Sequence, residues 1–302
     1  MGITKIARNK SNAIRNWKFT VSAREAWSEI LTIFKNEDPN YKVLLPSYIG
    51  WSPNEGSGIF DSVKNSGLDF QFYRMDSQLQ INFDDLKNQI KNNNKCVVLL
   101  VHYFGFIDLN YQEIVDWLKN NNIPFVEDCA HAWLSDLIGG RCGRNGQYSF
   151  YSLHKILPVE NGGMLVDNYP LNEEKCSVQP LMSLNFDLFS IFKKRIENYN
   201  YLISQLRGID NLQIIHQELE EGICPQTLPV IVENFDRNVL YQVMNDKGIG
   251  MVSLYHTMID ELKNFDSEAA QSTSKKIINF PVHQDISFLD IDDLVIKLKE
   301  VF

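Results

Sequence analysis

The stretch SLHKILPVENGG, at positions 152–163, gathers three side chains that can do chemistry ahead of a glycine pair. Lys155 offers an amine, which forms a Schiff base with a carbonyl compound when it is unprotonated. His154 is the side-chain type that most readily moves protons near neutral pH. Ser152 adds a hydroxyl. A lysine on a loop is more often a solvated charge, so the meaning of the stretch depends on what lies beside it.

A carboxylate follows an apolar run earlier in the chain. Asp128 closes the run PFVEDCAHA, and His131 comes three residues later. An aspartate there can cap a helix, or it can face a ligand beyond the end of a strand. An Asp, a Ser and a Lys on neighbouring strand ends match the needs of pyridoxal phosphate. The Asp keeps the pyridine nitrogen protonated, the Lys holds the aldehyde, and hydroxyls with backbone N–H groups hold the phosphate.

The first half of the chain has the strands and helices that such a site requires. Helix-like segments cover 82–91 and 111–120, and strands alternating with helices predict a parallel sheet with ligands at its carboxyl edge. Short apolar runs, rich in branched and aromatic residues, predict buried strands at 42–46, 70–73, 96–105, 124–132, 148–152 and 162–168.

The C-terminal third predicts a smaller α+β unit. A long helical pattern covers 186–206, a strand 227–233, and further helices 235–247 and 290–301. We therefore expect a large α/β domain over 1–184 and a linking helix with a small domain over 185–302.

Composition excludes several classes of protein. The 302 residues carry a net charge of −9 and no basic run typical of nucleic-acid binding. No apolar run approaches the ~20 residues of a membrane span, and the N-terminal MGITKIARNKSNAIRNW lacks the apolar core of a secretory signal. Five cysteines without a C-x-x-C pair predict reduced thiols in a cytoplasmic protein. We expect no metal, membrane or nucleic-acid partner.

The segments FVEDCAHAW and GQYSFYSLHKILPVENGGMLV together resemble the DegT/StrS-type aminotransferases, which are fold-type-I pyridoxal phosphate enzymes that mostly aminate nucleotide-linked ketosugars. The segment LLVHYFG is similar to the family's V-H-x-x-G motif, and NFPVHQ is similar to its C-terminal LP-x-H motif. The resemblance covers roughly residues 20–300 and is densest over 96–166. It implies a mostly parallel sheet in the large domain.

The resemblance assigns roles to the chemical residues. Lys155 would hold the cofactor, Asp128 would pair with the ring nitrogen, and Ser152 would meet the phosphate. His131, where the family more often has Gln, would lie near the phenolic oxygen. A dehydratase branch of the family replaces the Lys with His, so His154 is the alternative. Counting back from the glycine pair selects Lys155, whereas counting forward from Ser149 selects His154.

Three departures from the family pattern concern the rest of the site. Ser22, Ala23 and Arg24 stand where the family has S-G-T at a phosphate-binding helix start. In the loop YIGWSPNEG we expect Trp51, rather than Tyr48, to stack on the cofactor ring. The N-Y-R segment that usually completes the partner subunit's site is not visible after the glycine pair, and the chain is short for the family.

The resemblance, together with these residues, implies an aminotransferase that uses pyridoxal phosphate and glutamate to aminate a nucleotide-linked keto-sugar. We expect a homodimer. The alternatives are a pyridoxal phosphate-dependent sugar dehydratase or other lyase, and a catalytically silent relative with a binding or regulatory role.

Overall fold

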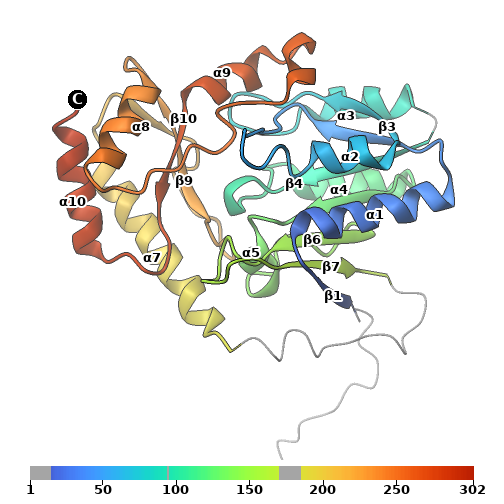
Figure 1. Ribbon diagram of the computed structural model, residues 1–302, viewed down its shortest axis with the longest axis horizontal. Helices are drawn as coiled ribbons and strands as arrows, with labels where there is room; N and C mark the ends of the chain where they lie inside the picture. Colours follow the sequence, from blue (N-terminus) through green and yellow to red (C-terminus); the bar gives the residue numbers. More distant parts are fainter. Residues whose placement is uncertain (1–14, 94, 170–184) are drawn as a thin grey trace, which may run out of the picture.

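The computed structural model describes residues 15–93, 95–169 and 185–302. Residues 1–14 of the N-terminal segment MGITKIARNKSNAIRNW lie outside this range. Residues 170–184, where the N-Y-R segment was sought, lie outside it as well. A seven-stranded sheet dominates the first half of the chain (Figure 1). Its strand order is β1-β7-β6-β5-β4-β2-β3. The strands are β1 (Asn16–Thr20), β2 (Lys42–Pro46), β3 (Asp69–Tyr73), β4 (Cys96–Val101), β5 (Phe125–Asp128), β6 (Tyr148–Ser152) and β7 (Gly163–Asp167).

Strand direction determines which side chains meet at one edge of this sheet. Strands β2 to β6 run parallel, whereas β7 is antiparallel to β6 and β1 is antiparallel to β7. Two reversals leave β1 running in the direction of β6, so its carboxyl end lies at the edge where the parallel strands end. The chain enters its first helix at that edge.

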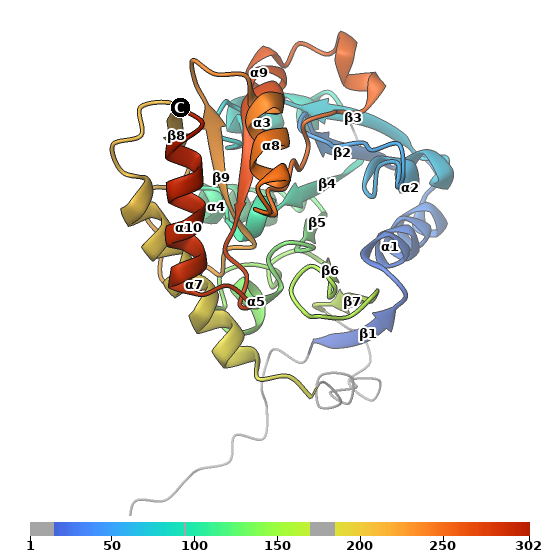
Figure 2. The same cartoon turned by 60° about the vertical axis from the view of Figure 1, so that its left-hand side comes forward.

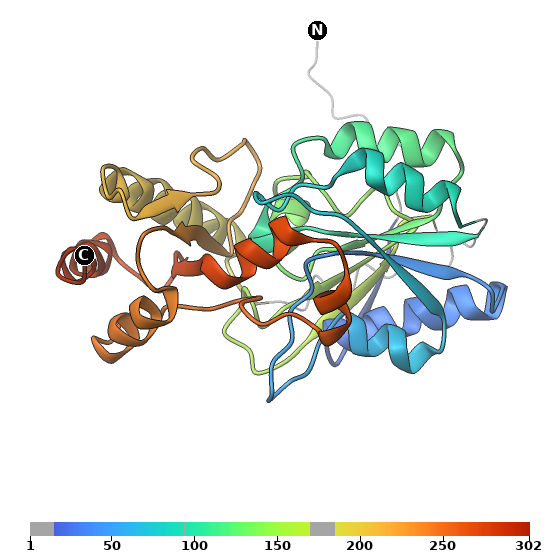
Figure 3. The same cartoon turned by 90° about the horizontal axis from the view of Figure 1, so that it is seen from above.

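Helices cover both faces of the sheet, as Figure 3 shows. On one face lie α1 (Ala23–Glu37) and α2 (Phe60–Ser66), and on the other lie α3 (Phe83–Lys91) and α4 (Tyr111–Asn120). Helix α1 is amphipathic and turns five apolar side chains onto the sheet, namely Ala26, Trp27, Ile30, Leu31 and Phe34. Short elements η1 (Tyr103–Gly105) and α5 (Trp133–Leu137) follow β4 and β5 at the carboxyl edge.

The C-terminal part packs beside the large sheet (Figure 2). An antiparallel sheet of order β10-β9-β8 contains β8 (Leu212–Ile214), β9 (Thr227–Val232) and β10 (Ile277–Pro281). Its helices are α7 (Leu188–Leu206), α8 (Arg237–Asp246), α9 (Glu268–Lys276) and α10 (Phe288–Lys299), with a 3-10 turn η3 (Asp260–Asn264). One hydrophobic cluster runs from α3 and α4 into this part, since Leu118 and Tyr199 both belong to it. The architecture confirms the predicted α/β fold; the domain boundary stays a prediction.

Candidate active site

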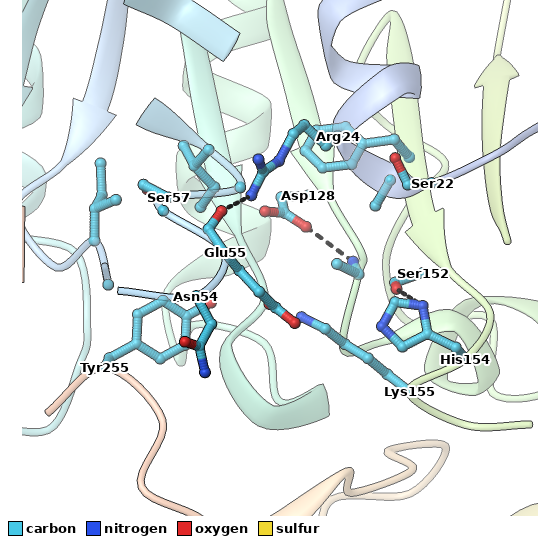
Figure 4. A pocket seen from close by; sticks show the side chains of 18 residues that line it. Ser22, Arg24, Asn54, Glu55, Ser57, Asp128, Ser152, His154, Lys155 and Tyr255 are labelled. Carbon is cyan, nitrogen blue, oxygen red and sulfur yellow. Dashed lines mark hydrogen bonds between the residues drawn. The ribbon is translucent and has the colours of Figure 1, made fainter. Parts of the chain in front are cut away.

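A cavity of about 530 Å³ opens at the carboxyl edge of the large sheet (Figure 4). It is lined by the start of α1, the ends of β5 and β6, the turn after β6 and the loop that follows β2. Residues that the sequence predicted for the site and that line this cavity are Ser22, Ala23, Arg24, Asp128, Ser152 and Lys155. The topology therefore brings together residues from distant parts of the chain.

The glycine pair fixes the position of the first turn of α1. Gly162 has a φ of +129°, donates its N–H to the carbonyl of Val21, and accepts the N–H of Leu153. A Cβ on Gly163 would lie 2.2 Å from the backbone carbon of Ser22 and 2.4 Å from the nitrogen of Ala23. Only a residue without a Cβ allows this approach. The pair thus places the helix start, with its unpaired N–H groups, at the cavity.

The start of α1 suits an anion. Ser22 caps the helix by accepting the N–H of Glu25 at 3.2 Å. Backbone N–H groups at a helix N-terminus are poor in internal partners and carry a partial positive charge. Arg24 lies nearby, but its guanidinium donates to the carbonyl of Glu55 at 2.5 Å, and the side chain is otherwise exposed. A small anion bound here would meet backbone donors first.

Asp128 lies at the carboxyl end of β5 between two parallel neighbours. Its carboxylate is 4% exposed and accepts the N–H of Ala130 at 2.9 Å. Burial raises the pKa of Asp128, and the charge of Lys155 acts in the opposite direction. A buried carboxylate with few local donors gains most from a cationic partner in the cavity.

Glu127, the residue before Asp128, points to the other side of the strand and has a structural role. Its carboxylate accepts hydrogen bonds from His102 Nε2 at 2.9 Å and from the Tyr111 hydroxyl at 2.6 Å. It also accepts backbone N–H groups of Gly143, Asn145 and Gly146. Burial alone would raise the pKa of Glu127, but these donors outweigh it and lower the pKa to about 2. Glu127 therefore holds the loop that leads into β6.

Lys155 directs its amine into the sheet edge, toward His131. The distance between Lys155 Nζ and His131 Nε2 is 2.6 Å. The other ring nitrogen of His131, Nδ1, accepts the backbone N–H of Phe104 at 3.1 Å. Burial lowers the pKa of Lys155, although the charges of Asp128 and Glu55 act to raise it. Burial also lowers the pKa of His131 well below its usual range, and the charge of Lys155 adds to this effect.

His154 has different surroundings from its neighbour. It is exposed, lines the cavity, and its Nδ1 lies 3.2 Å from the Ser152 hydroxyl. Burial lowers its pKa, with a further contribution from the charge of Lys155. Of the two residues left open by the sequence, Lys155 alone contacts His131 in the described chain.

Trp51 does not join this group. It is 43% exposed and lines a second cavity with Phe60, Asp61 and Lys64. Its backbone N–H pairs with the carbonyl of Thr257, which fixes the loop so that the indole lies outside the main cavity. The prediction of a stacking tryptophan depended on loop register, which sequence spacing specifies weakly.

Sequence reasoning assigned no role to several residues of the cavity, among them Tyr255 and Glu55. Tyr255 comes from the C-terminal part of the chain, and its ring packs edge-on against His131 with centroids 6.0 Å apart. Glu55 comes from the loop after β2, and Figure 4 shows its side chain directed toward Lys155. Glu55 lies in the loop YIGWSPNEG, which the sequence indicated only for its aromatic residues, whereas Tyr255 lies in no chemical motif, so the sequence carries no signal for it.

A buried group behind Asp128 bears on the expectation of no metal. Ligand atoms of His102, Cys129 and Cys142 lie within 4.8 Å of one another. Burial raises the pKa of both thiols, and both pack within a cluster of buried apolar side chains. His102 is held by Glu127 through Nε2.

No helix in the described residues is both long and apolar enough to span a bilayer.

Comparison with known proteins identifies relatives of this chain. The DegT/DnrJ/EryC1/StrS aminotransferase family model matches residues 58–186. A UDP-4-amino-4,6-dideoxy-N-acetyl-beta-L-altrosamine transaminase of Campylobacter jejuni is 28% identical over 166 residues, which cover 47% of this chain and 42% of the relative. The matched segment spans less than half the length of the curated relatives.

Solved structures extend the likeness over the whole fold. A putative sugar aminotransferase from Streptococcus pneumoniae superposes with a TM-score of 0.75 at 16% identity, covering 94% of this chain and 87% of that one. A GDP-4-keto-6-deoxy-D-mannose-3-dehydratase from E. coli gives 0.72 at 18% identity, covering 93% and 87%. At such identities the superpositions establish the shared fold. Over residues 58–186, from β3 to β7, the chain is in addition similar in sequence to the DegT/DnrJ/EryC1/StrS aminotransferase family.

Proposed function

We propose that this protein is a pyridoxal phosphate-dependent aminotransferase that aminates a keto-sugar, with glutamate as the amino donor. The observation that carries the proposal is the meeting of Lys155, Asp128 and the start of α1 in one cavity. An amine, a buried carboxylate and a helix N-terminus are the three groups that this cofactor needs.

The residues present fit pyridoxal phosphate. The cavity of about 530 Å³ lies within the range of roughly 300–1,000 Å³ that small-molecule sites occupy. The backbone N–H groups after Ser22, with the Ser152 hydroxyl, would hold the phosphate. Asp128 has the burial and charge to keep a pyridine nitrogen protonated. Lys155 would hold the aldehyde end.

Each residue has a distinct task in the proposed reaction. When bound, the cofactor supplies an electron sink for the carbon that loses or gains a proton. Asp128 holds the proton on the ring nitrogen by its charge. Lys155 Nζ takes a proton from the amino donor and returns one at the sugar carbon, as a general base and then a general acid.

The proposed substrate class follows from the relatives. The names of two curated relatives are a transaminase for a UDP-linked amino sugar and a GDP-perosamine synthase. A sugar carried on a nucleoside diphosphate is therefore the class to test first. We also propose that the protein is a homodimer in which loops of the second copy complete the sugar site.

A specific observation keeps a dehydratase as the second candidate. His154 lines the same cavity as Lys155 and lies beside Ser152. A histidine in place of the lysine would leave the donated amine on the cofactor and favour loss of a hydroxyl. The deeper burial of Lys155 and its contact with His131 favour the aminotransferase.

Covalent labelling separates these candidates. The protein is incubated with pyridoxal phosphate, reduced with borohydride and mapped by peptide mass spectrometry. We expect the label on Lys155 in wild type and in His154→Ala, and its loss in Lys155→Ala. The label on another lysine would refute the assignment. Adding glutamate should convert the bound cofactor to its amine form with release of 2-oxoglutarate.

A further inference from the structure

The His131 ring accepts a hydrogen bond at one nitrogen and faces Lys155 with the other. Its Nδ1 accepts the Phe104 N–H at 3.1 Å, and its Nε2 lies 2.6 Å from Lys155 Nζ. A nitrogen that accepts an N–H must present a lone pair. The proton of a neutral imidazole must then lie on the other nitrogen, Nε2. Burial keeps this imidazole neutral.

The backbone at Phe104 holds this arrangement. Phe104 has a φ of +56°, which is uncommon for a residue with a side chain. Its carbonyl accepts the N–H of Gln226 at 2.7 Å, and its ring stacks on His131 at 19°. A Cβ on the next residue, Gly105, would lie 2.3 Å from the carbonyl oxygen of Cys224. The donor N–H is therefore fixed by packing on both sides, and the opposite tautomer would leave it without its acceptor.

We infer that His131, locked by the Phe104 N–H as its Nε2–H tautomer, donates to Lys155 and holds that amine as the free base. An ammonium at 2.6 Å would face an N–H with its own N–H groups, whereas a neutral amine offers a lone pair. The free base is the form that attacks a carbonyl carbon. His131 is thus a positioning residue that keeps Lys155 reactive at neutral pH.

The other groups around the amine do not supply this function. Asp128 from β5 and Glu55 from the loop after β2 favour the ammonium by their charges. His154 precedes Lys155 on the same turn and is turned toward Ser152. Tyr255 brings a phenol from the C-terminal part, and burial raises its pKa, so it is neutral. Burial and the His131 N–H therefore favour the neutral amine of Lys155, whereas the two carboxylates favour its ammonium form.

A free-base Lys155 serves the reaction set out under the proposed function, and the inference rests on that function to this extent. Its test uses the cofactor-free protein. Histidine nitrogen NMR of the wild type should show His131 as a neutral ring protonated on Nε2 between pH 6 and 8. A ring protonated on Nδ1 would overturn the inference. This result does not depend on whether the protein binds pyridoxal phosphate, so it can fail while the proposed function stands.

Trace acetylation as a function of pH, mapped by peptide, measures how much of Lys155 is the free base. The exposed Lys193 serves as an internal reference. His131→Leu removes both hydrogen bonds, and we expect about a tenfold smaller neutral fraction of Lys155 at pH 8, the change that accompanies loss of one net hydrogen bond. His131→Gln can accept from Phe104 and donate to Lys155, and it should restore the wild-type profile.

The variants separate positioning from mere packing. An unchanged Lys155 profile in a folded His131→Leu protein would overturn the inference, as would a Gln variant that behaves like the Leu variant. Circular dichroism checks the fold. Where His131→Leu does not fold, the wild-type tautomer and the His131→Gln profile decide the question.

Discussion

Replacing Gly163 with alanine should move the first turn of α1 away from the cavity and weaken both the fold and cofactor binding. The new Cβ would lie 2.2 Å from the Ser22 backbone carbon, 2.4 Å from the Ala23 nitrogen and 2.5 Å from the Ser22 oxygen. All three are backbone atoms, so no side-chain rotation relieves the contact. The helix start must shift, and with it the donors that would hold a phosphate.

The magnitude follows from overpacking. Inserting a methyl group into a packed site costs about 1–3 kcal/mol, and three backbone contacts below 3.0 Å place this change in the upper half of that range. Gly250→Ala is the matched control, because nothing lies within 4 Å of its built Cβ. We expect that control to change the free energy of unfolding by less than about 0.5 kcal/mol.

Urea unfolding and pyridoxal phosphate titration measure the two effects. The Gly163→Ala midpoint should fall with an unchanged m-value, and cofactor affinity should fall about tenfold, equivalent to about 1.4 kcal/mol. Borohydride labelling should still reach Lys155. Midpoints that coincide for the two variants would show that the Ser22 segment is not held against the glycine pair as described.

Four further predictions follow from the same structure. Asp128→Asn should keep the fold, measured by circular dichroism, and lose most transamination, because the amide carries no charge for the ring nitrogen; near-normal turnover contradicts its role. The pKa of Glu127 is about 2 in the fold and near 4.5 when unpaired. Its stabilisation should be complete above pH 4.5 and decline as the pH falls toward 2, and in acid titrations Glu127→Gln should lack this component. Gln284 donates to the carbonyl of Ile156 at 3.1 Å, next to Lys155, so Gln284→Ala should slow labelling of that lysine without lowering the melting temperature by more than a few degrees. Light scattering should find a dimer; an active monomer near 35 kDa would refute the shared site.

The sequence predicts the large sheet well because its buried strands are short apolar runs with distinct ends. The runs at 42–46 and 148–152 coincide with β2 and β6. Strand β1 was missed because NWKFT, although it alternates polar and apolar residues, is only five residues long; it becomes a strand through pairing with β7. That pairing aligns Thr20 with Gly163 and thereby carries the chain to Ser22. Ser22 and Ser152 therefore line the same cavity because of strand pairing between distant segments, which no local sequence pattern shows.

Some site residues could be found from local motifs, whereas others reach the site only through tertiary contacts. Motif spacing could propose Asp128 and Lys155 because each follows a strand whose end is visible in the sequence. Spacing from the glycine pair favoured Lys155, but counting from Ser149 kept the neighbouring His154 as an alternative. Their environments differ through contacts with His131, which lies on another strand end. Tyr255 and Gln284 reach the site only because the C-terminal part folds back onto the large sheet.

Backbone strain is concentrated around one of these non-local contacts. Of the five non-glycine residues with positive φ in the described chain, Phe104 and Tyr255 both pack against the His131 ring. Such conformations cost about 1–3 kcal/mol each and persist only where the surroundings impose them. A fold under selection for stability alone has no reason to hold two strained aromatic residues against one histidine. The strain is explained if the position and tautomer of His131 matter to the amine of Lys155.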